Sequence, residues 1–194
     1  MVAGVTVGLI AGYFGGLIDE ILIRIADILI IIPRLPLLIV LATLMEPGIP
    51  SIMFVIALTG WTGMARQIRA LTLSLREYQY VQSTRAIGAG NAHIIIQHIL
   101  PNVMGVVFAN YVMSVTAIIL LETGLSFLGF GDPMRPSWGQ MLYFAQADGA
   151  FGRNAWWWWF PPGLCITILC AAMAFIGTTL NDRFVLRLKR GGRA

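Results

Sequence analysis

Residues 77–102 read EYQYVQSTRAIGAGNAHIIIQHILPN and form a polar segment between two apolar stretches of the chain. Gly88 lies near its centre with helix-forming runs on either side, and Pro101 lies near its end. Glycine readily adopts backbone angles closed to other residues, and proline interrupts helices. The segment therefore predicts two short helices, Tyr78–Ile87 and His93–Leu100, that meet at an angle. Such organisation is typical of a surface that docks a soluble partner.

The second of these helices has its own expected boundaries. Asn91 is expected to cap it, because an amide oxygen can accept a bond from a free backbone N–H. Pro101 is expected to end it and to redirect the chain into the next apolar stretch. His93 and His98 are five residues apart and have no acidic or cysteine companions at suitable spacing. A docking or packing role is therefore favoured over a metal site for the two histidines.

The composition indicates a membrane protein. Hydrophobic residues make up 58% of the 194 residues and charged residues 11%, whereas a soluble domain carries about 25% charged residues. Thirteen bases and nine acids give a net charge of +4. The bases lie at the ends of apolar stretches rather than on one face, and no recognition motif accompanies them. This pattern argues against nucleic acid as a partner.

Several stretches are long and apolar enough to cross about 30 Å of hydrocarbon as helices. The four candidates are Ile21–Met45, Ser51–Leu71, Val103–Thr123 and Trp156–Leu180. A fifth, Met1–Phe14, is shorter and is interpreted as the cut end of a longer span. We therefore expect an all-α, polytopic transmembrane helical bundle of about five spans, the first incomplete, in a single domain over residues 1–194.

The distribution of the bases predicts how the bundle is oriented. Ten of them lie in the connections 15–24, 66–101 and 183–194, whereas the connections 46–50 and 126–155 carry only Arg135 and Arg153. Since cytoplasmic connections are rich in Lys and Arg, we expect the segment 77–102 and the C-terminus in the cytoplasm. Residues 126–155 then form an outer loop. Trp156–Trp159 fall at the outer interface, where an aromatic belt is favoured over a sugar-stacking platform.

Small residues inside the apolar stretches are assigned to packing. A stripe with a spacing of four residues lets two helix backbones approach closely in lipid. This stripe consists of Gly4, Gly8, Gly12 and Gly16. Cys165 and Cys170 lie about 140° apart on a helix, which suits neither a disulfide nor a shared metal. Both are expected to be small core residues.

Charged residues within the spans have two open interpretations. Arg34 lies between Pro33 and Pro36 in the middle of a predicted span, where a charge costs about 2.5–3.5 kcal/mol on insertion scales. It either lines a water-filled solute path along a kinked helix or caps carbonyls freed by the prolines. Glu122 either shapes an outer gate or is a solvated helix end, and the second is favoured. Arg24 and Asp27 are expected to form a local ion pair.

The segment 77–102 resembles the cytoplasmic coupling loop of ABC-transporter permeases. That pattern reads E-A-A, three residues, G, nine residues, then I-x-L-P. Gln82-Ser83-Thr84 occupy the E-A-A positions, Gly88 matches the glycine, and Leu100-Pro101 close the pattern with His98 in the place of Ile. The Q-H-I-L-P-N of residues 97–102 is similar to the R-H-I-L-P-N of the dipeptide/oligopeptide/nickel branch. Residues 8–16, 126–131 and 136–142 resemble other stretches of that branch.

The resemblance implies a permease subunit with the type I ABC importer fold in the cell membrane. Its implied partners are a second homologous permease, two ATPase subunits and an external solute-binding protein. The residues implied to contact an ATPase are Gln82, Ser83, Thr84, Arg85, Ala86, Gly88, Ala89, Leu100 and Pro101. Family members carry an acid where Gln82 stands, so one charge is absent from the implied interface. The solute, a peptide, nickel or an oligosaccharide, is not identified by the sequence.

No catalytic residue, cofactor or metal is expected in this chain, because it has no G-x-x-x-x-G-K-[ST] loop and ATP hydrolysis would belong to a separate subunit. Two alternatives stay open. An ATPase-independent channel would not need the segment 77–102. An intramembrane hydrolase would need a nucleophile and a base together at depth, whereas both histidines lie in that polar segment. Compared with the family, the chain lacks the first span and first outer loop, which we interpret as a fragment or a misplaced start codon.

Overall fold

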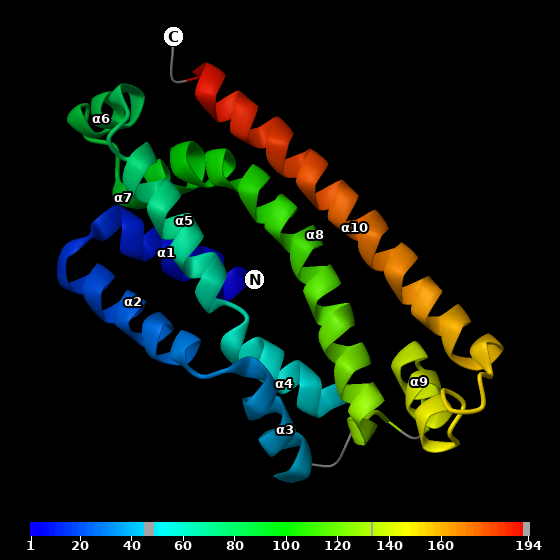
Figure 1. Cartoon of the computed structure of the whole chain (residues 1–194). Helices are drawn as coiled ribbons and strands as arrows, with labels where there is room; N and C mark the ends of the chain where they lie inside the picture. The colour runs from blue at the N-terminus through cyan, green and yellow to red at the C-terminus, as the bar shows by residue number, and fades with distance from the viewer. Residues whose placement is uncertain (45–48, 133, 192–194) are drawn as a thin grey trace. The chain divides into compact units, whose positions relative to one another are not determined.

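The computed structural model describes residues 1–44, 49–132 and 134–191, and this part of the chain is helical and contains no strand (Figure 1). The helices are α1 Val2–Phe14, α2 Gly16–Ile31, α3 Arg34–Leu44, α4 Ile49–Thr59, α5 Thr62–Leu75, α6 Gln79–Ala86, α7 Asn91–His93, α8 Leu100–Leu125, α9 Trp138–Ala147 and α10 Trp156–Gly191. Two π-helical turns, η1 Ile94–Ile99 and η2 Ser126–Phe130, adjoin α8. The all-α prediction is confirmed.

Two helical stretches among the described residues are long and apolar enough to cross a bilayer: Asn91–Phe130 and Trp156–Thr179. The first contains the whole predicted span Val103–Thr123, and the second contains all but the last residue of the predicted span Trp156–Leu180. The other two predicted spans are interrupted, one at Ile32-Pro33 and one at Gly60-Trp61, so each consists of two shorter helices. Proline explains the first break, because it disfavours helix at the residue before it, and Ile32 is extended with φ −73° and ψ 117°.

The chain divides into two compact units. The first contains Met1–Ile32, Thr59–Tyr111 and the chain from Thr178 onward. The second contains Pro33–Leu58 and Val112–Gly177.

In the first unit, α1 packs against α5 along the predicted glycine stripe. A Cβ added at Gly4 would lie 2.5 Å from the carbonyl oxygen of Trp61, the N-cap residue of α5, and one at Gly8 would lie 2.6 Å from the carbonyl oxygen of Ala65. One at Gly12 would lie 2.7 Å from the Thr72 Cβ. Contacts that advance along both helices in the same direction make α1 and α5 parallel. Gly16 is the exception, since it has open space around it and a φ of 57°, and it turns the chain into α2.

Two ion pairs join α2 to α5. The carboxylate of Asp19 accepts from Nε and Nη2 of Arg69, the latter at 2.6 Å, and Asp27 accepts from Nε of Arg66 at 2.9 Å. The earlier acid pairs with the later arginine, so the two helices are antiparallel. The predicted pair between Arg24 and Asp27 is wrong, because the Asp27 carboxylate binds the arginine of the neighbouring helix instead.

The core of the first unit reaches into the polar segment. Its buried members are Leu9, Tyr13, Met64, Ile68, Leu75, Val81, Ile94, Ile99, Val103 and Val107. Val81 comes from α6, and Ile94 and Ile99 come from η1, and all three are 0% exposed. The segment 77–102 is therefore folded onto the bundle by apolar burial and is not a free loop.

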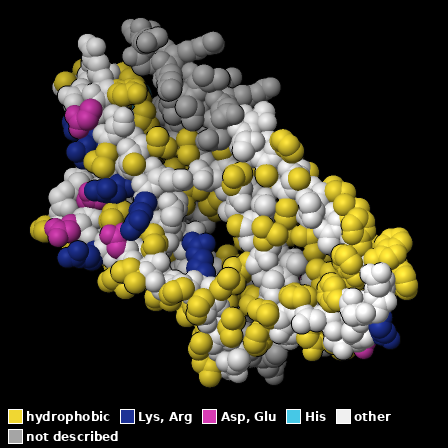
Figure 2. Space-filling view, in the orientation of Figure 1, with side chains coloured by type: hydrophobic (Ala, Val, Ile, Leu, Met, Phe, Trp, Pro, Cys, Tyr) yellow, Lys and Arg dark blue, Asp and Glu magenta, His cyan; other side chains and the backbone are white. Residues whose placement is uncertain are grey.

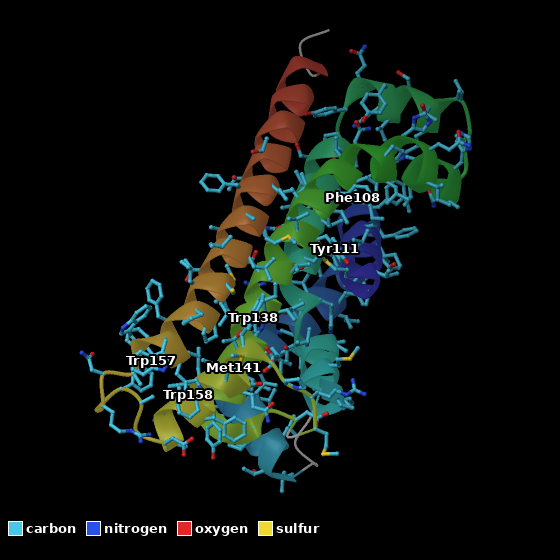
Figure 3. All side chains as sticks on the ribbon, turned by 90° about the vertical axis from the view of Figure 1, so that its right-hand side faces the viewer. Phe108, Tyr111, Trp138, Met141, Trp157 and Trp158 are labelled. Atoms are coloured by element: carbon cyan, nitrogen blue, oxygen red, sulfur yellow. The ribbon has the colours of Figure 1, made fainter. Side chains whose placement is uncertain are left out.

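In the second unit, the predicted outer loop is structured. Its helix α9 packs onto the end of α8 so closely that a Cβ at Gly139 would lie 2.6 Å from the carbonyl oxygen of Thr123. Gly129, with φ 92°, turns the chain out of η2. Trp138 and Met141 on α9 and Trp157 and Trp158 at the start of α10 are labelled in Figure 3.

One packing interpretation in the second unit is wrong in part. Cys165 is exposed and Cys170 is partly exposed. The Cys165 thiol therefore lies outside any core formed by this chain alone. Helical periodicity is weak in a stretch that is apolar all round, so the sequence does not distinguish the buried side of this helix from the exposed side.

Candidate functional site

The first structured part of the segment 77–102 is the short helix α6 with the turn at Gly88. The helix matches the predicted range Tyr78–Ile87 within one residue at each end. Gly88 has φ 87°, a conformation that other residues rarely adopt. Its N–H donates to the carbonyl of Arg85 at 3.0 Å, and the N–H of Ala89 donates to that of Thr84 at 3.3 Å. These two bonds form a Schellman motif, which fixes the end of the helix.

The second predicted helix exists, but it does not end at Pro101. The helical stretch that begins at Asn91 continues without a break to Phe130. Its hydrogen-bonding pattern becomes π-helical over η1, directly before Pro101. Such a local change in the pattern lets a helix accommodate the missing N–H of a proline in its interior. Nδ2 of Asn102 also donates to the carbonyl of His98 at 2.6 Å. The prediction that Pro101 ends this helix is therefore wrong, and Gly90, not Asn91, occupies the N-cap position.

The residues predicted to contact an ATPase separate into two groups. Around α6 the exposed ones are Gln82, Ser83, Arg85, Ala86 and Gly88, while Thr84 and Ala89 are partly buried. Leu100 packs against the core of the unit from α8, and Pro101 beside it is exposed. The structure thus brings the α6 residues together on one projecting element, with the other two residues at its base.

Ile87 was not among the predicted contact residues, although it is the most exposed apolar side chain next to α6. It directly precedes Gly88, and its relative exposure is 85%. Within α6, by contrast, Val81 is fully buried. The sequence signal that could have indicated Ile87 is its position between a mostly polar helix and Gly88. The element therefore has one exposed apolar side chain, Ile87, and one apolar side chain buried in the core, Val81.

Gln82 lies beside an acid of its own segment. Its Nε2 donates to Oε2 of Glu77 at 3.2 Å, and Nε of Arg76 donates to Oε1 of the same carboxylate at 3.0 Å. Figure 2 shows Lys and Arg side chains interspersed with Asp and Glu over the helices of this unit. A carboxylate at position 82 would face the like charge of Glu77, so an amide is the better neighbour here.

The two histidines take part in ring packing. The ring centroids of His93 and His98 are 5.7 Å apart, and that of His98 is 6.2 Å from that of Tyr80. Burial raises the pKa of the Tyr80 phenol, and the nearby Tyr78 adds to the rise. Nδ2 of Asn102 donates to the Tyr80 hydroxyl at 3.3 Å. Among the described residues, no group of three or more His, Cys, Asp or Glu could hold a metal ion.

The two candidate path residues belong to the second unit. Arg34 is the first residue of α3, directly after the helix break, and its side chain is exposed. Glu122 accepts a hydrogen bond from Oγ of Ser126 at 2.7 Å and lies within a helical stretch that continues to Phe130. The helix α8 itself ends at Leu125, so Glu122 lies in its last turn. The kink that was expected beside Arg34 is present.

Comparison with known proteins gives a consistent result. A family model described as binding-protein-dependent transport system inner membrane component matches residues 4–190. The chain is 38% identical over 182 residues to a putative peptide permease protein of Brucella ovis, covering 93% of this chain and 60% of that protein. It is 37% identical over 188 residues to the dipeptide transport system permease protein DppC of Bacillus subtilis, covering 96% and 58%.

A further relative is the oligopeptide transport system permease protein OppC of Bacillus subtilis, with 35% identity over 194 residues, 98% of this chain and 62% of that protein. The chain spans about six tenths of the length of these curated relatives. The family match covers residues of both compact units, including α6 in the first unit. The chain therefore belongs to the family of binding-protein-dependent transport system inner membrane components.

Proposed function

We propose that this chain is the permease part of an ATP-driven importer for peptides or a related solute, and that α6 receives the force from an ATPase subunit. Three relatives at 35–38% identity are named as peptide, dipeptide and oligopeptide permeases, which supports the solute class. The observation that carries the proposal is the α6 element itself. It is a capped helix with exposed polar residues, an exposed Ile87 and a buried Val81.

The packing of α6 suits it to transmit force. Val81 shares one core with Ile94 and Ile99 of η1, so α6 cannot shift without displacing the start of the helical stretch Asn91–Phe130. Packed cores respond to displacement by switching between discrete arrangements, which is the basis of alternating access in transporters. The energy source is external in this proposal, because the sequence has no phosphate-binding loop of the G-x-x-x-x-G-K-[ST] type.

The proposal includes an orientation and a set of partners. The α6 element and the C-terminus lie in the cytoplasm, and residues 126–155 lie outside. The distribution of Lys and Arg supports this orientation. The parallel packing of α1 on α5 supports the order of the spans, because the first and third of about five spans must run in the same direction. A second homologous permease, two ATPase subunits and an extracytoplasmic solute-binding protein complete the importer. The solute path between the two permeases includes Arg34 and Glu122.

Site-specific photo-crosslinking tests the proposal. A photoreactive amino acid replaces Ile87 in one variant and Trp157, which is 64% exposed on α10, in the control. Both are expressed in the native cell, and captured proteins are identified by mass spectrometry. We expect an ATPase subunit at position 87 and none at position 157. Capture at position 157, or at neither position, would contradict the proposed orientation and partner.

Replacement of residues 79–89 by a flexible linker separates the importer from a channel. An importer would lose both ATPase association and solute uptake. A channel would keep its solute flux, because conduction does not depend on an external motor.

A further inference from the structure

We infer that Tyr13 is a positioning residue that holds both arms of the Gly88 turn against the end of α1. The inference rests on the proposed function, in which this turn receives force from an ATPase. Tyr13 belongs to α1, far from the turn in sequence, and nothing in the coupling-loop pattern points to it. Its side chain is 5% exposed and lies in the core of the first unit.

One ring makes a contact on each side of the turn. On the N-terminal side, the guanidinium carbon of Arg85 lies over the Tyr13 ring, 5.2 Å from its centroid. This is within the distance at which a cation is attracted to an aromatic face. On the C-terminal side, the Tyr13 hydroxyl donates to Oδ1 of Asn91 at 2.9 Å. The last residues of α6 and the first residue of the next helix are thus bridged by a single side chain.

The backbone of the same residue is fixed to a third helix. Nη1 of Arg76, just after α5, donates to the carbonyls of Gly12 at 3.1 Å and of Tyr13 at 3.4 Å. The last carbonyls of a helix have no partner within the helix, so this guanidinium completes the end of α1. The glycine contacts already press α1 onto α5. Tyr13 therefore stands on a rigid base, and the Gly88 turn can open only if its hydroxyl or its ring loses a partner.

This arrangement assigns α1 a part in coupling. A force on α6 reaches the long helix through Val81, as argued above, and reaches α1 through Arg85 and Tyr13. Because a neutral hydrogen bond and an exposed cation–aromatic contact are each weak in net terms, the bridge can break and reform within a transport cycle. It positions the turn for the ATPase without locking it.

Conservative variants separate positioning from folding. Tyr13→Phe removes the hydroxyl and keeps the buried ring, so the core remains filled. Asn91→Ala removes the acceptor at an exposed position. The matched control is Tyr143→Phe on α9, which removes a hydroxyl that makes no hydrogen bond within the described part of the chain.

The first measurement is hydrogen exchange of the purified chain, which does not depend on any partner. We expect the amides of residues 79–90 to exchange about two- to tenfold faster in Tyr13→Phe, the range set by one hydrogen bond. Tyr143→Phe should leave them unchanged. Unchanged exchange in Tyr13→Phe would overturn the inference.

The second measurement uses the complete importer in vesicles and reports solute moved per ATP hydrolysed. We expect each single variant to lower this ratio by about two- to tenfold while ATPase subunits still co-purify. The double variant Tyr13→Phe/Asn91→Ala should be no worse than the single ones, because partners in one bond are not additive. Faster exchange with an unchanged ratio, or additive losses, would overturn the positioning role. Failure of ATPase subunits to co-purify with the unaltered chain would instead overturn the proposed function, and the coupling role with it.

Discussion

Asp19 and Arg69 form a two-point ion pair between α2 and α5, fifty residues apart in sequence. Their side chains are 13% and 34% exposed, respectively, which makes this the more buried of the two pairs between these helices. The pair between Asp27 and Arg66 is 40% and 49% exposed. Because screening by solvent falls as burial rises, the two pairs should contribute differently to stability.

Arg69→Gln should destabilise the chain by roughly 1.5–3 kcal/mol, since it removes hydrogen bonds to a charged, largely buried partner. Arg66→Gln is the matched control on the same helix and should cost about 1 kcal/mol or less. Thermal unfolding of the purified protein in detergent measures both. Equal losses at the two sites would show that burial does not set the difference.

The glycine stripe should not tolerate one added methyl group. In Gly8→Ala the new Cβ would lie 2.6 Å from the carbonyl oxygen of Ala65 and 2.7 Å from the Cβ of Ile68. Neither atom can rotate away, so α1 must separate from α5, at a cost of about 1–3 kcal/mol for overpacking. Gly63→Ala on α5 is the control, because its Cβ would meet no atom within 4 Å. It should be neutral or gain up to about 1 kcal/mol from helix propensity. A stable Gly8→Ala would contradict the close contact.

The turn at Gly88 should depend on backbone conformation and not on space. Its φ is 87°, and a Cβ there would meet no atom within 4 Å. Gly88→Ala should therefore cost about 1–2 kcal/mol in local order, whereas Gly88→Asn should cost less because asparagine visits this region. Gly90→Ala is the control, since Gly90 has φ −68°. Hydrogen exchange over residues 79–90 reports the order of the turn. An effect of equal size at both glycines would rule out the conformational explanation.

The contact between α9 and the end of α8 should be equally sensitive. Gly139→Ala would place a Cβ 2.6 Å from the carbonyl oxygen of Thr123 and 2.8 Å from the Cβ of Ser126. We expect α9 to detach, with faster proteolysis of residues 134–155 in right-side-out vesicles or in detergent-solubilised protein. Gly124→Ala, one residue further along α8, meets no atom within 4 Å and should leave the proteolysis rate unchanged. Similar rates in the two variants would contradict the packing of α9.

Arg34→Gln should lower solute uptake while membrane insertion stays intact, because the side chain keeps its length and loses its charge. Uptake is measured in vesicles, and insertion by the amount of chain recovered in the membrane fraction after alkaline washing. The control is Arg24→Gln, an exposed arginine on α2. Unchanged uptake in Arg34→Gln would remove this residue from the solute path.

Local rules account for what the sequence predicted well. Four glycines of the chain at a spacing of four residues predicted a close helix contact along α1, and three of them lie against α5. A proline indicated the break before Arg34. The break at Gly60-Trp61 was missed, because a glycine inside an apolar stretch is compatible with a continuous membrane helix. The α6 helix and the turn at Gly88 were predicted from a helix-forming run that a glycine interrupts.

The wrong predictions concern features that the spacing of neighbouring residues does not reveal, above all contacts between residues far apart in the sequence. The pair between Arg24 and Asp27 satisfied the helical rule for neighbours, yet the Asp27 carboxylate found Arg66 on another helix. A proline predicted the end of a helix at Pro101, whereas the π-helical turn before it allowed the helix to continue. The Tyr13 hydroxyl and Asn91 are 78 residues apart, and only the packing of α1 on α5 brings them together.

The backbone contact of α1 also constrains how this gene can vary. Every amino acid other than glycine has a Cβ, so no missense change in the codons of Gly4, Gly8 or Gly12 avoids the atoms of α5 that lie 2.5–2.7 Å from that position. Gly63 faces no such limit. A deep mutational scan should therefore find that almost no substitution is tolerated at Gly4, Gly8 or Gly12, whereas substitutions at Gly63 should be tolerated.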